Sequence, residues 1–487
     1  MSGAGVSSQA EVRFESATGK WIIAAAVLGS GIAFLDSTVI NVAIPAIRED
    51  LDTGLAGVQW TIDAYLLTLS ALLLIGGSLG DLYGRRRMFV YGLVGFAVTS
   101  MLCAVAPNIA VLNLSRALQG MTAALLVPGS LAMISASFHP DDRGRAIGAW
   151  SGLSGVTTAV GPFLGGFLID AVSWRMIFLI NVPLAAIAVW VAVIHVPETR
   201  DEEGGRKPDV PGALAAAVAL GGILYGFIEG PVVGWDSPSI YGSLALGSVA
   251  VVVFLVIEAR SREPMLHLSL FRSRQFSGAN AATLLIYAAL SGAMFLVVIQ
   301  LQSVLDYSPL EAGAALVPVT LLLLVMSARA GAIATRIGPR LPMTIGPLVA
   351  AIGLALLGRI EPGTSYATVA LPGIVVFGIG LGITVAPLTT AVLAAAPSRY
   401  AGIASGVNNA VARTAGALAV AILPIAGGIA GAASDSPERF DAGFTRTMVV
   451  AAGLCAAGGL LSFVFIRKPG DPVISSPLTA GGEVPED

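Results

Sequence analysis

Three charged residues within apolar runs are the side chains of this sequence best placed to do chemistry. Asp36 is the lone charge in the run from Trp21 to Ile44, and Asp63 and Arg116 lie within two later runs. A charge at the centre of a membrane helix costs about 2.5 to 3.5 kcal/mol, so it usually serves a substrate or proton pathway. Two carboxylates that compete for one guanidinium could bind and release a proton, because the carboxylate without the arginine is driven toward its neutral form. The pattern therefore predicts a proton-coupling site.

The three residues are predicted to lie at similar depths. Counted at about 1.5 Å per residue from the outer ends of their runs, Asp36 lies roughly 13 Å deep, Arg116 roughly 9 Å and Asp63 roughly 8 Å. All three then belong to the outer half of one helix bundle. One simpler interpretation stays open, in which Asp36 and Arg116 form a static pair and Asp63 faces outer water.

The composition indicates a polytopic membrane protein. Of the 487 residues, 55% are hydrophobic and 12% are charged, whereas soluble domains contain about 25% charged residues. The mean hydropathy is +0.84. The net charge of -3 gives no reason to expect a nucleic-acid partner. Cys103 and Cys455 fall in separate apolar runs, and no spacing indicates a disulfide framework, a metal site or a cofactor.

Fourteen apolar runs are long enough to cross a bilayer. The even number places both termini on one side, and most Lys and Arg residues fall in the loops on that side, so we expect cytoplasmic termini and a plasma-membrane location. The boundary between the seventh and eighth runs, from Glu229 to Trp235, is the least clearly marked in the sequence. A single re-entrant element there stays open as an alternative.

An internal repeat divides the chain into two six-helix halves. One constant shift aligns Arg145, Gly148, Ser151 and Gly152 with Arg399, Gly402, Ser405 and Gly406. Repeated halves are typical of secondary transporters, which bind substrate at the interface between the halves. The predicted parts are a cytoplasmic tail (1–20), an N-terminal half (21–196), a linker (197–210), two additional helices (211–258), a cytoplasmic loop (259–275), a C-terminal half (276–466) and a second tail (467–487). We expect a monomer in the lipid bilayer.

The segment GSLGDLYGRRRMF between the second and third runs has a specific spacing of glycines and charges. Its defining residues are Gly77, Asp81, Gly84, Arg85, Arg86 and Arg87. This segment resembles the signature loop of the major facilitator superfamily, which implies a loop that stabilises one transport state. A second copy, from Gly331 to Arg340, has Thr335 in place of the aspartate and is predicted to be weaker.

The fifth run is rich in small residues that allow close helix contact, and tight packing alone would account for them. Its segment GPFLGG, with Gly161, Pro162, Gly165 and Gly166, also resembles the antiporter motif of proton-driven exporters in the same superfamily. Together with LDSTVINVAIP (35–45) and LSRALQGMTAALLVPGS (114–130), this segment makes the whole chain similar to the drug:proton antiporter family with fourteen helices. The resemblance implies a proton gradient as the energy source.

The expected function is export of amphipathic drugs or drug-like metabolites in exchange for protons, by alternating access. A dedicated exporter or importer of one metabolite is the alternative, and a non-transporting membrane sensor is less favoured because no loop is long enough for a soluble domain. An enzyme is not expected. Polar residues predicted to line the substrate path are Asn41, Gln119, Asn408, Asn409 and Arg413. Arg413 could bind an anionic or zwitterionic substrate or pair with Asp36.

Overall fold

The computed structural model describes the chain except residues 1–11, 201–207, 397–400, 432–435 and 467–487. The repeat residue Arg399 and most of both predicted tails therefore lie outside the described residues. The described part is helical apart from an isolated bridge between Val12 and Phe138. Its helices are α1 (Ala17–Asp50), α2 (Leu55–Tyr83), α3 (Arg85–Ala104), α4 (Ile109–Ala123), α5 (Leu126–Ser137), α6 (Pro140–Ala171), α7 (Met176–Leu179), α8 (Asn181–His195), α9 (Val210–Val233), α10 (Pro238–Arg260), η1 (Leu268–Arg272), α11 (Arg274–Ser303), α12 (Pro309–Ala315), α13 (Val317–Ile337), α14 (Arg340–Leu357), η2 (Tyr366–Ala370), α15 (Leu371–Ala394), α16 (Ala401–Gly427) and α17 (Pro437–Phe465).

Fourteen helical segments of the described chain are long and apolar enough to span a membrane, which confirms the predicted all-α fold. The fourth span consists of α4 and α5, with a break at Ala124 and Leu125. Pro128 accounts for the break, because it has no N–H to donate to the carbonyl four residues earlier. A tight turn separates α2 from α3 at Gly84, whose φ of +105° suits glycine.

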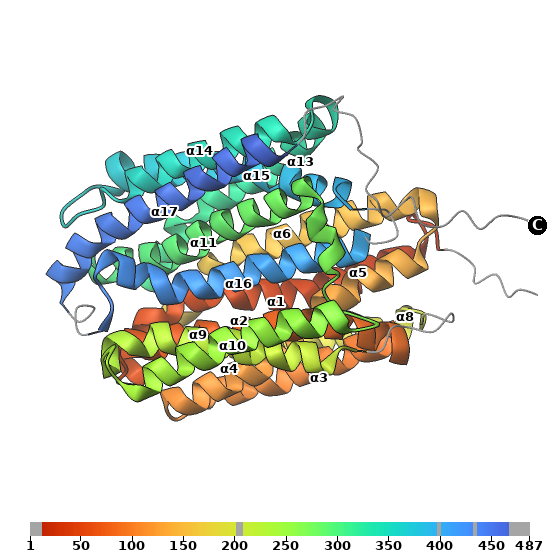
Figure 1. Ribbon diagram of the computed structural model, residues 1–487, viewed down its shortest axis with the longest axis horizontal. Coiled ribbons are helices and arrows are strands. Elements are labelled where there is room, and N and C mark those ends of the chain that lie inside the picture. The colour runs from red at the N-terminus through yellow and green to blue at the C-terminus, as the bar shows by residue number, and fades with distance from the viewer. Residues whose placement is uncertain (1–11, 201–207, 397–400, 432–435, 467–487) are drawn as a thin grey trace, which may run out of the picture.

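The helices form two bundles, one from α1 to α8 and one from α11 to α17. Within the first bundle, α1 packs on α6 and α8, and α2 packs on α4. Within the second bundle, α14 packs on α15 and α17, and α11 packs on α16 and α17. Figure 1 shows α13, α14, α15 and α17 together on one side of the molecule and α2, α3 and α4 on the other. The bundles meet where α6 contacts α12 and α13 and where α2 contacts α16.

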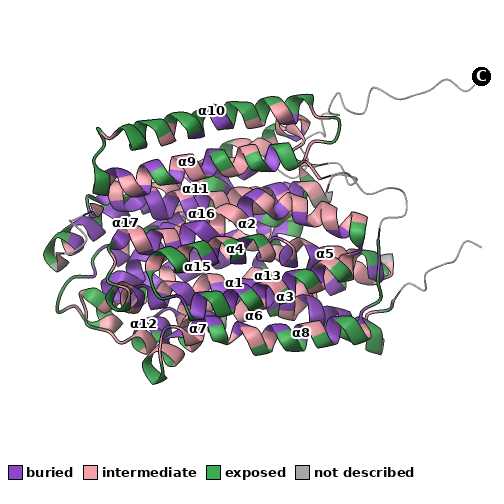
Figure 2. Ribbon diagram, turned by 90° about the horizontal axis from the view of Figure 1, so that it is seen from below, coloured by how far each residue is buried: buried purple, intermediate pink, exposed green. Residues whose placement is uncertain are grey.

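The two additional helices, α9 and α10, are complete antiparallel spans rather than one re-entrant element. Helix α9 packs on α2 and α16, one helix from each bundle, whereas α10 packs mainly on α9. Figure 2 shows α10 at the edge of the molecule with most of its length exposed. Glu229 to Pro231, whose placement was uncertain from sequence, belong to α9, and Gly234 ends that helix at a φ of +99°.

The two ends of the bundle differ in how the halves meet. We call the end that holds the Gly77–Arg87 segment the loop end, and the end where α1 finishes at Asp50 the opposite end. At the opposite end, one hydrophobic core combines residues of both halves, including Val42 and Leu112 of the first and Leu296 and Phe444 of the second. Near the loop end, the two halves have separate cores.

One face of α6 shows the separation of the halves directly. Gly148, Gly152, Gly155, Pro162 and Gly166 follow one another at helical spacing along this face. A Cβ at Gly166 would lie 2.4 Å from the Pro309 carbonyl oxygen of α12, so the face touches the other half there. A Cβ at Gly148, Gly152 or Gly155 would meet nothing within 4 Å. Along α6 the halves are therefore in contact toward the opposite end and apart toward the loop end, whereas α2 and α16 stay in contact as far as Leu74 and Gly406.

Candidate functional site

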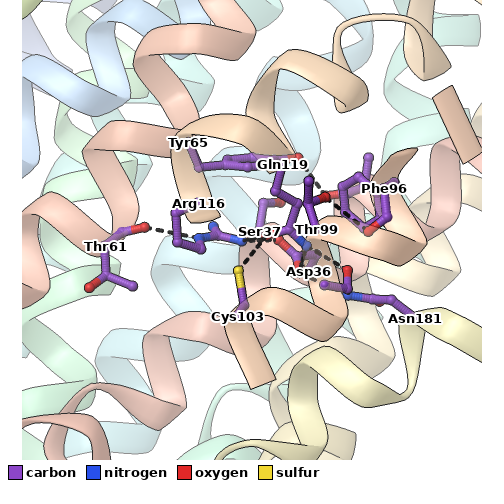
Figure 3. Close-up of polar contacts among 12 residues, drawn as sticks. Asp36, Ser37, Thr61, Tyr65, Phe96, Thr99, Cys103, Arg116, Gln119 and Asn181 are labelled. Carbon is purple, nitrogen blue, oxygen red and sulfur yellow. Dashed lines mark hydrogen bonds and ion pairs between the residues drawn. The ribbon is translucent and has the colours of Figure 1, made fainter. Parts of the chain in front are cut away.

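A buried ion pair occupies the predicted coupling site. Asp36, in the middle of α1, accepts a hydrogen bond of 2.5 Å at Oδ2 from Nη1 of Arg116 on α4. Both side chains are 1% exposed. Arg116 also donates from Nε to the Thr61 carbonyl oxygen at 3.0 Å, and its guanidinium centre lies 4.3 Å from the centre of the Tyr65 ring. Figure 3 shows Arg116 extended between Thr61 and Asp36. The structure thus joins two of the three predicted residues.

Polar neighbours satisfy the second oxygen of the carboxylate. Asp36 Oδ1 accepts from Gln119 Nε2 at 3.0 Å and from Asn181 Nδ2 at 2.9 Å. Both amides also donate to the Ser100 hydroxyl, at 2.8 and 3.3 Å respectively. A buried charge is stable when its remaining lone pairs are hydrogen-bonded, and these amides supply that here. In this conformation the ionised form of Asp36 is well accommodated.

This network corrects one sequence prediction and adds two residues. Gln119 was predicted to line the substrate path, but it is fully buried and also accepts from Arg116 Nη1 at 2.6 Å. Asn181 and Ser100 were not predicted. The available signal for Asn181 was an amide inside the sixth apolar run; Ser100 gave none, because serine is common in membrane helices.

Asp63 does not join the ion pair. Its side chain is 0% exposed, and neither carboxylate oxygen has a hydrogen-bond partner in the described chain. The alternative that it faces outer water is therefore wrong for this conformation. It lies on the same face of α2 as Gln59, whose amide donates to the Val420 carbonyl oxygen of α16 at 2.6 Å. Asp63 thus sits on the helix face that packs against the second half.

The surroundings of Asp63 determine its protonation in this conformation. Burying an ionised carboxylate without a donor costs far more than burying a neutral polar group, so such a group is buried in its neutral form. Burying a carboxylic acid whose hydroxyl has no hydrogen-bond partner still costs free energy, but it buries no unpaired charge. The two carboxyl groups therefore differ in their surroundings: Asp36 lies beside a guanidinium and two amide donors, and Asp63 has no donor in the described chain.

The remaining path residues differ in their contacts. Asn408 donates to Asn280 Oδ1 and Thr283 Oγ1 of α11, at 3.1 and 2.7 Å. Among the described residues, Asn41 donates to two backbone carbonyls of its own helix, each at 3.5 Å. Asn409 accepts from Arg413 Nε at 3.2 Å, and Arg413 makes no ion pair with Asp36.

The signature loop is held by a residue that the sequence did not reveal. Asp81 pairs with Arg85 at 2.7 Å. Glu198, just after α8, accepts from the backbone N–H groups of Arg86 and Arg87 at 3.0 and 3.1 Å. Those N–H groups lie in the first turn of α3 and have no helical partner, so Glu198 caps that helix. These contacts hold the signature loop to other residues of the first half.

The antiporter segment lies at the contact between the halves. A Cβ at Gly161 would lie 2.1 Å from Thr38 Oγ1, and one at Gly165 would lie 3.0 Å from Val39, both on α1. A Cβ at Gly313 of α12 would lie 2.2 Å from the Pro162 carbonyl oxygen. Small residues here allow α6 to touch α1 and α12 at the opposite end.

Replacing Gly166 with valine should prevent this closure. The new side chain would overlap α12, and overpacking of about 1 to 3 kcal/mol would lower the closed population by about tenfold or more. Spin labels at Glu49 and Glu361, both exposed at the opposite end, should report a longer distance, and transport should fall in parallel. Gly155→Val, on the same face but facing nothing within 4 Å, is the matched control. An unchanged distance in Gly166→Val would contradict this account.

Within the described residues, no group of three or more His, Cys, Asp or Glu side chains lies close enough to hold a metal ion. The buried polar groups around Asp36 are carboxyl, guanidinium, amide and hydroxyl groups.

Comparison with known proteins identifies the family. Residues 26–420 match the model of the Major Facilitator Superfamily. The chain belongs to this family. It is 34% identical over 401 residues to the tetracenomycin C resistance and export protein of Streptomyces glaucescens, a match that covers 82% of this chain and 74% of that protein. It is 36% identical over 409 residues to the puromycin resistance protein of Streptomyces alboniger, covering 83% of this chain and 80% of that one.

Two solved structures share the fold. A peptide transporter of the POT family in complex with sulfate superposes with a TM-score of 0.67 at 16% identity, over 93% of this chain and 96% of that one. A bacterial homologue of the human lysosomal transporter Spinster gives a TM-score of 0.63 at 16% identity, over 92% and 97% of the two chains. The superfamily member described here is therefore a multi-pass membrane transporter and not an enzyme.

Proposed function

We propose that this transporter exports amphipathic small molecules across the cytoplasmic membrane in exchange for protons. The observation that carries the proton coupling is the pair of unlike carboxyl sites in one half: Asp36 paired with Arg116, and Asp63 buried without a partner. Support for export comes from the relatives, which are named for resistance to, or export of, tetracenomycin C and puromycin. With cytoplasmic termini, the loop end faces the cytoplasm, and this conformation is open inward.

The location of Asp63 supplies a gating rule. When the halves separate at the opposite end, the face of α2 that carries Asp63 becomes exposed to outer water. The carboxyl group of Asp63 can then ionise. Closure buries this face against α16, so closure requires that the carboxyl group has taken up a proton. Uptake of a proton by Asp63 from outer water therefore favours the closed conformation, and through this differential stability the outer proton concentration shifts the equilibrium between the two conformations.

The ion pair supplies the second element of the coupling. Protonation of Asp36 would release Arg116 from its charge partner, and the fixed amides of Gln119 and Asn181 would lose a charged acceptor. These contacts link α1, α3, α4 and α8, so their rearrangement would act on the whole first half. We propose Asp36, Asp63 and Arg116 as the proton-coupling residues.

The experiment is proton-driven flux in proteoliposomes that contain the purified full-length chain. Ethidium, N-phenyl-1-naphthylamine and 2-naphthoate serve as cationic, neutral and anionic probes. We expect at least one probe to move against an imposed pH gradient, with proton movement reported by a lumenal pH-sensitive dye, and to stop when a protonophore collapses the gradient. Flux that persists after collapse would contradict proton coupling. No flux of any probe would contradict broad export and favour a dedicated transporter of one metabolite.

A further inference from the structure

Arg413 is a charged residue near the middle of α16 that the coupling site does not use. It lies about 18 Å from the first residue of that helix, counted at about 1.5 Å per residue. Its Nε donates to Asn409 Oδ1 at 3.2 Å, and its guanidinium centre lies 5.9 Å from the centre of the Phe34 ring on α1. Helices α16 and α1 belong to different halves, so Arg413 lies at the interface where secondary transporters bind their substrates.

Arg413 has no counter-charge, in contrast to Arg116. Within the described chain, no carboxylate lies within 4.0 Å of its guanidinium, and the titratable groups that interact with it electrostatically are Tyr65 and Tyr287. Asp36 is already occupied by Arg116. An unpaired charge at this depth is costly and is found facing a polar partner or a pathway. A negatively charged group from outside the described chain would therefore complete the contacts of Arg413.

Asp63 does not supply that charge in this conformation. A Cβ at Gly416, one turn from Arg413, would lie 3.0 Å from the Ser291 hydroxyl oxygen of α11 and 3.7 Å from Leu66 Cδ1 of α2. The helices run antiparallel, with Gln59 against Val420 and Leu74 against Gly406. In this register the Leu66 contact lies between Asp63 and Arg413. Asp63 is on the closed side of the contact and Arg413 on the side toward the loop end.

Arg413 nevertheless keeps part of its surface exposed. Arg413 and Phe34 are both partly exposed, although both lie at mid-helix positions between the two halves. The core that seals the opposite end begins beyond Arg413 on α16, at Ala419. Toward the loop end, the halves have separate cores, and the α6 glycine face meets nothing. The hydrophobic core shared by both halves therefore does not extend to Arg413 on its loop-end side.

We propose that Arg413 binds the anionic group of the transported compound and that the preferred substrates are amphipathic monoanions, such as aromatic carboxylates. The guanidinium, oriented by Asn409, receives the negative charge, and the Phe34 ring packs against the apolar body. The inference rests on the proposed export function but concerns recognition alone. It predicts a charge preference that can be measured without any proton gradient.

The test is equilibrium binding of two radiolabelled compounds to the purified full-length protein in detergent. 2-Naphthoate and 2-naphthamide have the same ring system and differ in charge. The wild-type protein should bind the carboxylate about tenfold or more tightly than the amide, because charge-assisted hydrogen bonds are roughly twice as strong as neutral ones. Arg413→Gln should remove this preference with little change in amide binding, and Arg413→Lys should retain part of it. Arg413→Glu should favour 2-naphthylmethylammonium instead.

Arg329→Gln is the matched control, because Arg329 is exposed on α13 and its Nη1 contacts only the Val325 carbonyl oxygen of its own helix. Size-exclusion chromatography and thermal unfolding verify the folding of every variant. Equal binding of carboxylate and amide, binding of neither, or an unchanged preference in Arg413→Gln would overturn the proposal. Proton-driven flux of neutral probes by the same preparation would show that export survives this failure, so the two proposals are tested separately.

Discussion

Replacing Asp36 with asparagine is expected to abolish gradient-driven export and to destabilise the first half. Arg116 would keep its charge, 1% exposed, without the carboxylate that now lies 2.5 Å away. Removing one partner of a buried ion pair costs about 3 to 5 kcal/mol, because the other charge is left uncompensated. Proton-driven efflux in everted vesicles and thermal unfolding of the purified protein measure the two effects.

Two variants separate the loss of coupling from the loss of stability. Asp50→Asn breaks the Asp50–Arg175 pair, which has the same 2.5 Å distance but is partly exposed, so it should cost only about 0 to 1 kcal/mol and leave export unchanged. Asp36→Asn combined with Arg116→Gln removes both charges and should recover much of the stability without restoring coupled export. Full gradient-driven efflux in Asp36→Asn would refute the assignment of Asp36.

Replacing Asp63 with asparagine is expected to leave the stability nearly unchanged and to abolish gradient-driven export, as Asp36→Asn does. The buried carboxyl group has no hydrogen-bond partner, and a neutral amide of similar shape replaces a neutral acid. The free energy of unfolding should change by no more than about 1 kcal/mol, since no paired group is lost. Export against a pH gradient should nevertheless stop, because the side chain can no longer exchange a proton.

Substrate exchange without a gradient distinguishes a lost proton site from a damaged transporter. Asp63→Asn should still exchange labelled for unlabelled substrate across proteoliposomes at zero gradient, because the halves can close over a permanently neutral side chain. Gln59→Ala, one turn away on the same face, removes the hydrogen bond to Val420 and leaves the carboxyl group intact, so it should retain gradient-driven export. A large loss of stability in Asp63→Asn would show that the carboxyl group is ionised and paired.

The pairing of Asp36 with Arg116 was predictable because depth in a membrane helix follows from counting residues. Asp63 has a similar counted depth, yet it faces α16 instead of Arg116. Counting residues gives the position of a side chain along its helix. Which neighbouring helix that side chain contacts depends on how the two halves are rotated against each other. The same reason explains why Gln119 was assigned to the substrate path and why Asn181, Ser100 and Glu198 were missed.

The sequence by itself determined the family, the fourteen spans and the kinds of charged group inside them. These properties are local, since the length and hydropathy of a run decide whether it crosses a bilayer, and the spacing of Gly77, Asp81 and Gly84 stays within one loop. Only the tertiary structure decided that the described chain offers no hydrogen-bond partner to the buried Asp63 and no carboxylate to Arg413, and that one hydrophobic core joins the halves at one end. Each of these depends on contacts between helices hundreds of residues apart, and hydropathy carries no information about such contacts.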